Sequence, residues 1–173
     1  LKDAIDHRPG HLTSQLELLQ QRSWLLHWSL FVFFNLENGR ELLIDLMFDE
    51  KYLNTIQTNC PHLLRYLTAA IVTNRRDRKT LGQLVQILTQ ESYTYSDPLT
   101  EMVRLVFSDF DFRGGARALA RCETLLDNDF FLSFVRDEFM AAARLFFAEQ
   151  FCRVHQTVDI KSLSATLNIS DES

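Results

Sequence analysis

Histidine and cysteine, the side chains that most often do chemistry, are scattered along this sequence. None of the five histidines forms an HExxH or CxxH motif. His27 lies within an apolar stretch, which favours a hydrogen-bonded core histidine over a metal ligand. Gly114 and Gly115 lack the GK[ST] ending and the preceding strand of a phosphate-binding loop. The sequence therefore predicts no catalytic residue, no metal site and no cofactor.

The three cysteines indicate a reducing compartment. Cys60, Cys122 and Cys152 are odd in number and widely spaced, and they form no CxxC pair. Each lies in an apolar helical context, so we expect buried, reduced thiols. This pattern predicts a cytoplasmic protein, with the nucleus as the alternative location.

A cluster of positive charges is the first candidate for binding a partner. The segment RRDRK contains Arg75, Arg76, Arg78 and Lys79, which are four cations within five residues. The pattern predicts a turn between two helices. Two interpretations remain open: a solvated turn, or a contact with RNA phosphates or with an acidic partner.

An aromatic stretch, QRSWLLHWSLFVFFN at residues 21–35, is the second candidate. Trp24, Trp28 and Phe31 follow helical spacing, which is typical of a core stripe. We therefore expect a central helix covered by neighbouring helices, with an interface to another chain as the alternative. His27 and Ser29 interrupt the apolar run, which is shorter than the ~20 residues of a membrane span. The sequence predicts no membrane association.

The elements that carry these residues have the pattern of helices. Ser14 and Glu17 match a capping box, and Asp97 with Pro98 matches an N-cap followed by the first helical residue. No stretch alternates apolar and polar residues with period two, which excludes a β-rich core. Helices are expected over residues 15–34, 42–47, 50–57, 61–74, 80–90, 98–110, 111–126 and 129–155.

Short turns between these helices predict antiparallel neighbours, in either a compact bundle or a solenoid of helical hairpins. The start signals at Ser14, Asn59, Asp97 and Asn128 are spaced like those of helical repeats, which favours the solenoid. Residues 156–173 differ from the rest. Their pattern of cap, short helix, turn and second cap is typical of the start of a helix-turn-helix or winged helix.

Composition limits the function classes. The 173 residues are 46% hydrophobic and 24% charged, as in a globular protein. A net charge of −5 argues against binding nucleic acid by bulk attraction. The chain begins at Leu1, and LKDAID has the pattern of the end of a helix, so we expect an internal fragment of a longer protein.

Several long stretches resemble a known family. They are LQQRSWLLHWSLFVFFN, YLNTIQTNCPHLLRYLTAAIVTN, QESYTYSDPLTE and LLDNDFFLSF. They are similar to the E-subunit family of eukaryotic translation initiation factor 3, whose members carry a PCI domain. The likeness runs from about Leu16 to Ile169.

This resemblance implies an all-α fold, a right-handed, TPR- or HEAT-like helical-repeat solenoid of a PCI domain followed by the start of a winged helix. Residues 1–13 would end an upstream helix, 14–155 would form the helical repeats, and 156–173 would begin the winged helix. The implied function is a non-enzymatic scaffold that assembles with other subunits of the factor and supports recruitment of mRNA and the small ribosomal subunit. Two alternatives remain: a PCI subunit of a proteasome-lid or signalosome complex, and a winged-helix module that binds nucleic acid.

Overall fold

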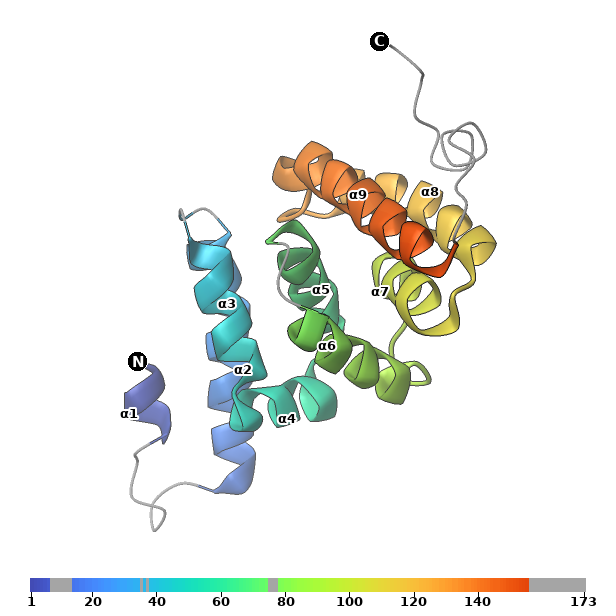
Figure 1. The fold of residues 1–173 in the computed structure, drawn as a ribbon. Helices are drawn as coiled ribbons and strands as arrows, with labels where there is room; N and C mark the ends of the chain where they lie inside the picture. Colours follow the sequence, from blue (N-terminus) through green and yellow to red (C-terminus); the bar gives the residue numbers. More distant parts are fainter. Residues whose placement is uncertain (7–13, 35, 37, 75–77, 156–173) are drawn as a thin grey trace.

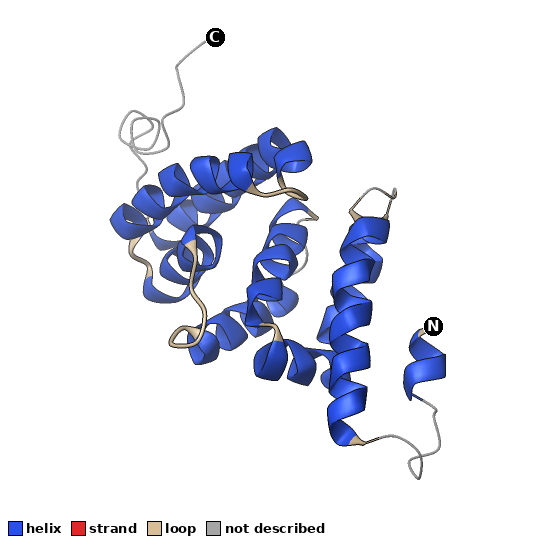
Figure 2. Ribbon diagram, turned by 180° about the vertical axis from the view of Figure 1, so that it is seen from behind, coloured by secondary structure: helices blue, strands red, loops and turns tan. Residues whose placement is uncertain are grey.

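The structure is a computed structural model, and it describes residues 1–6, 14–34, 36, 38–74 and 78–155. Every regular element in these ranges is a helix, as Figure 2 shows, so the all-α prediction is confirmed for the described part. The predicted winged helix at 156–173 lies outside the described residues. The α-helices are α1 (Lys2–Asp6), α2 (Gln15–Phe33), α3 (Gly39–Phe48), α4 (Glu50–Asn59), α5 (Leu64–Thr73), α6 (Arg78–Glu91), α7 (Pro98–Arg104), α8 (Phe112–Asn128) and α9 (Arg136–Val154).

In the described ranges, three short helical segments lie between these α-helices. They are the 3-10 turns η1 (Pro61–Leu63) and η3 (Ser133–Val135), and the π-helical segment η2 (Leu105–Asp109) that continues α7. None of the helices within the described ranges is long and apolar enough to cross a bilayer.

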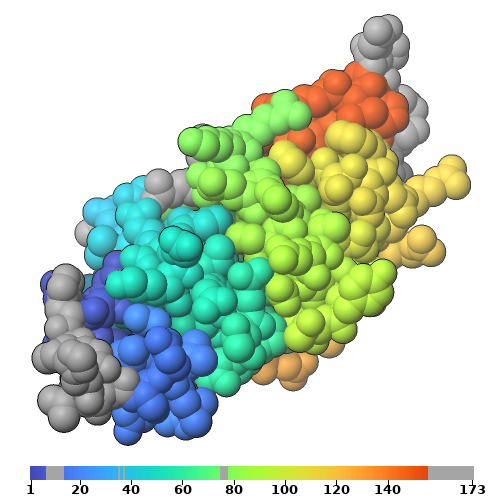
Figure 3. Space-filling view, turned by 90° about the horizontal axis from the view of Figure 1, so that it is seen from below, coloured from blue at the N-terminus to red at the C-terminus, as the bar shows by residue number. Residues whose placement is uncertain are grey.

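Most helices lie beside helices that are close to them in the chain. α2 packs against α3 and α4, α3 packs against α5, and α5 in turn contacts α7 and α9 (Figure 1). From below, the colours pass from blue at one end of the molecule to yellow and red at the other (Figure 3). The chain therefore advances along the long axis of the molecule as its helices are added.

The helix starts agree with the capping signals in the sequence. The Ser14 hydroxyl accepts a hydrogen bond from the backbone N–H of Glu17, and the Glu17 carboxylate accepts one from the N–H of Ser14. Asp97 caps α7 in the same way, with Thr100 as its partner. At the turn between α2 and α3, a Cβ on Gly39 would lie 2.1 Å from the carbonyl oxygen of Phe33. Only glycine fits this approach.

Two predicted boundaries are wrong. The last long helix begins at Arg136 rather than near Asp129, because the Asp129 carboxylate accepts hydrogen bonds from the N–H groups of Phe131 and Leu132 and holds a turn there. Arg78 and Lys79 do not lie in a turn; they begin α6. Arg75 and Arg76 are outside the described residues.

The core runs through the whole described part and is centred on α5. Leu64, Leu67 and Ala70 of this helix are fully buried. Figure 1 shows α5 between the α2–α3 pair and the α7–α9 group, and its contacts with α3, α7 and α9 agree with this position. α5 is therefore the helix on which both ends of the molecule depend.

Tyr52 offers a test of this core. It is fully buried, and its hydroxyl has no hydrogen-bond partner among the described residues. An unpaired buried hydroxyl is unfavourable, so we expect Tyr52→Phe to keep or raise the free energy of unfolding at neutral pH, by up to about 1 kcal/mol. Urea titration measures this value, and a clear loss of stability would contradict the expectation.

The same variant should change the pH dependence. Burial, and then the charge of Asp6, raises the pKa of Tyr52 from 10.0 to about 12. The unfolded chain therefore loses this proton first, and the tyrosine's contribution to stability is lost as the pH rises from about 10 to about 12. In Tyr52→Phe, the decline in stability over this range should be smaller.

Candidate protein-interaction surface

A row of exposed aromatic rings lies along α2. Trp24, Trp28 and Phe31 are 54%, 52% and 48% exposed. The ring centroids of Trp24 and Trp28 are 5.8 Å apart, and those of Trp28 and Phe31 are 5.4 Å apart. The row continues to Phe130, whose ring lies 6.2 Å from Phe31 and is 69% exposed. We call these four residues the aromatic face.

The prediction that Trp24, Trp28 and Phe31 form a core stripe is wrong for this chain. α2 buries Leu26, Ser29 and Leu30 instead, and it packs on α3 and α4 with that side. The apolar pattern extends nearly all round α2, but the helix has neighbours on only part of its circumference. The alternative, an interface with another protein segment, therefore becomes the better interpretation of the aromatic face.

An apolar groove adjoins the aromatic face. Trp24, Trp28 and Val32 of α2 form one wall, and Leu42 and Leu46 of α3 form the other. Its volume is about 540 Å³. Large exposed apolar areas of this kind mark sites of protein contact in soluble proteins.

The start of the chain borders one end of this groove. Leu1 and Lys2 line the groove together with α2 and α3. Salt bridges hold α1 in place, from Arg22 to Asp6 at 3.1 Å and from Lys2 to Asp49 at 2.8 Å. These two ion pairs therefore hold α1 at the border of the groove.

An ion-pair network anchors the turn that carries Phe130. The Arg65 guanidinium on α5 donates to the carboxylate of Asp97 at 2.7 Å and to that of Asp129 at 2.9 Å. Both carboxylates are buried, with side chains 6% and 4% exposed. The Tyr66 hydroxyl also donates to Asp129, at 3.1 Å.

The electrostatics of this network favour the charged arginine. Burial opposes the charge of Arg65, but its hydrogen bonds to Asp97 and Asp129 outweigh this effect and raise its pKa. For Tyr66, burial and then the charge of Asp129 raise the pKa to about 12. The network thus joins the start of α7 to the turn before α9. It also places Phe131 4.8 Å from Phe31, ring centroid to ring centroid.

The cations of the RRDRK segment that the structure describes do not lie beside the aromatic face. Arg78 lies at the start of α6, where its guanidinium is 5.8 Å from the centre of the Phe107 ring. Lys79 is exposed on the same turn of helix. No contact of the described residues links Arg78 or Lys79 to Trp24 or Trp28. The helical periodicity did not predict that Arg65 binds Asp97 and Asp129, because these carboxylates are 32 and 64 residues away in the sequence.

The histidines and cysteines form no metal centre in the described part of the chain, where no three His, Cys, Asp or Glu side chains come together. His27 is exposed rather than in the core, and its Nε2 lies 2.9 Å from Nε2 of His62. Cys60 and Cys122 are buried as predicted, whereas Cys152 is exposed on the last turn of α9. The prediction of burial is therefore wrong for Cys152.

Comparison with known proteins shows a close likeness to one named protein. A protein of Culex quinquefasciatus is 46% identical over 173 residues, which cover 99% of this chain, and one of Phaeosphaeria nodorum is 46% identical over 179 residues. A Bombyx mori protein is 45% identical over 174 residues. All three are named as the E subunit of eukaryotic translation initiation factor 3. This chain is homologous to that E subunit.

The homology covers part of the E subunit. The chain spans 39% of the Culex and Bombyx proteins and 41% of the Phaeosphaeria protein. No family model matches the chain. The resemblance to the E-subunit family is confirmed by the 45–46% identity to these relatives.

Proposed function

We propose that this chain is a non-enzymatic scaffold segment of the E subunit within eukaryotic translation initiation factor 3. The observation that carries the proposal is an identity of about 46% over nearly the whole chain to proteins of that name from insects and a fungus. The helices follow one another along the molecule, which supports a role in presenting surfaces to neighbouring proteins.

In this proposal, residues 14–155 form the helical-repeat region of a PCI domain, and the winged helix begins within 156–173. The other subunits of the factor are the direct partners, and the small ribosomal subunit is reached through the assembled complex. Such a protein works in the cytoplasm. The aromatic face and its groove supply a contact surface, because large exposed rings near the centre of an interface carry much of its binding energy.

The proposal is tested by affinity purification of the tagged 173-residue chain from cells. The co-purified proteins are identified by mass spectrometry at low and at moderate salt. We expect subunits of the initiation factor to remain bound at moderate salt, because apolar contacts are not screened by ions.

A parallel sample treated with ribonuclease separates direct contacts from those bridged by RNA. If the subunits of the initiation factor remain bound after nuclease treatment, the result supports direct protein contacts and the scaffold proposal. Recovery of RNA with a variable set of proteins that dissociate in salt would contradict the proposal and favour a nucleic-acid-binding module.

A further inference from the structure

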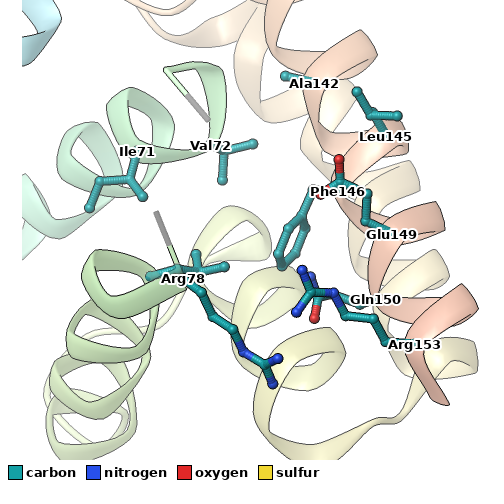
Figure 4. A pocket seen from close by; sticks show the side chains of 10 residues that line it. Ile71, Val72, Arg78, Ala142, Leu145, Phe146, Glu149, Gln150 and Arg153 are labelled. Carbon is teal, nitrogen blue, oxygen red and sulfur yellow. The ribbon is translucent and has the colours of Figure 1, made fainter. Parts of the chain in front are cut away.

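A second, smaller pocket lies away from the aromatic face, between α5, α6 and α9. Figure 4 shows the Phe146 ring and the Arg153 side chain extending from α9 toward the space between the helices, with Arg78 at the start of α6. The volume of the pocket is about 170 Å³. A cavity of roughly 150 Å³ accepts a benzene ring, so this pocket holds one apolar side chain.

Part of the pocket wall is apolar, beside polar and charged residues. Ile71 and Val72 come from the end of α5, Leu81 comes from α6, and Phe146 comes from α9. Each of these side chains is less than 10% exposed, so core packing holds the walls in place. The pocket can therefore contact one apolar side chain of a ligand through this part of its wall.

Two arginines lie at the rim of the pocket. Arg78 and Arg153 are both exposed, and neither forms an ion pair within the described part of the chain. The guanidinium of Arg78 lies 5.8 Å from the centre of the Phe107 ring, and a contact with a ring orients the cation without neutralising its charge. Glu149 also lines the pocket, so two cations face one anion.

We infer that this pocket binds a short acidic peptide motif of a partner protein. An apolar side chain of the motif fills the space between Val72 and Phe146, and a neighbouring carboxylate pairs with Arg78 and Arg153. Guanidinium groups bind carboxylates through paired hydrogen bonds, which fixes the orientation of such a motif. RNA fits less well, because its phosphates bring no apolar side chain to fill the space between Val72 and Phe146.

This inference goes beyond the proposed function, since it uses none of the residues of the aromatic face. It also extends the prediction for the RRDRK segment. Of the four cations in that segment, Arg78 lines the pocket. The second arginine at the pocket, Arg153, lies 75 positions later in the chain, and the sequence did not indicate it as a candidate.

Peptide titration of the 173-residue chain tests the inference by fluorescence anisotropy. The probes are labelled hexapeptides with two glutamates and one leucine, in which the leucine occupies each possible position. Matched peptides replace the leucine with serine or the glutamates with glutamine. We expect saturable binding of at least one glutamate–leucine peptide and weaker binding of both matched controls.

The protein variants locate the binding site. The double variant Arg78→Gln and Arg153→Gln is expected to bind at least about tenfold more weakly, because each lost bond to a charged group is worth about a factor of ten. The control is Arg113→Gln with Arg117→Gln, two exposed arginines of α8, which changes net charge by the same amount and should bind normally.

Three outcomes would overturn the inference. The first is no saturable binding of any peptide in the set. The second is equal weakening by the two double variants, which would indicate nonspecific attraction. The third is tighter binding of a labelled decamer of uridines that depends on Arg78 and Arg153, which would assign the pocket to RNA. None of these results bears on whether subunits of the initiation factor are retained.

Discussion

Replacing Arg65 with methionine is expected to lower the free energy of unfolding by about 3–5 kcal/mol, because it leaves two buried carboxylates without a counter-charge. Asp97 and Asp129 are both less than 10% exposed and both accept hydrogen bonds from Arg65. Methionine keeps the apolar stem of arginine and removes the guanidinium, so the loss arises chiefly from the missing charge and its hydrogen bonds. Urea unfolding followed by circular dichroism measures the change.

A surface ion pair supplies the matched control. Arg121 donates to Glu101 at 2.6 Å, but its side chain is 57% exposed. Arg121→Met should therefore change the free energy of unfolding by less than about 1 kcal/mol. Arg65→Lys should fall between the two, because lysine keeps the charge but cannot reach both carboxylates with a planar fork. If Arg65→Met proved as mild as Arg121→Met, the network would not anchor the turns that it joins.

The helices of this chain could be predicted well from local signals. Ser14 with Glu17, and Asp97 with Pro98, mark helix starts because a side-chain oxygen caps backbone N–H groups within the same few residues. Such signals need no knowledge of the rest of the fold. The all-α class and the starts of α2 and α7 follow from them.

The errors arose where a long-range contact decides the structure. Asp129 has the pattern of a helix start, yet it caps a turn whose position depends on Arg65 of α5. Likewise, periodicity showed that α2 is apolar on several sides, but not which side its neighbours cover. Burial of a given ring depends on the packing of α3 and α4, which a helical pattern does not contain. The sequence therefore identified Trp24, Trp28 and Phe31 as a group, but wrongly predicted that they are buried.

Trp28 is expected to matter for association and little for folding. It is the central ring of the aromatic face, in contact with Trp24 and Phe31, and it also lines the groove. Since Trp28 is 52% exposed, Trp28→Ala should lower the free energy of unfolding by less than about 1 kcal/mol. A tryptophan at the centre of an interface is worth about 2 kcal/mol or more, so binding of the recovered subunits should weaken by about 30-fold.

Replacement of Tyr93 is the control that distinguishes a specific contact of Trp28 from nonspecific association through any exposed aromatic ring. Tyr93 lies in the turn after α6 and is fully exposed, so Tyr93→Ala removes an aromatic side chain elsewhere on the surface. It should leave both stability and recovery of the subunits unchanged. A stability loss of about 3 kcal/mol in Trp28→Ala, with unchanged association, would instead place Trp28 in a core. The aromatic face is an interface only if the two effects separate, because a ring that is half exposed in the free chain can lose its remaining contact with water only in a complex.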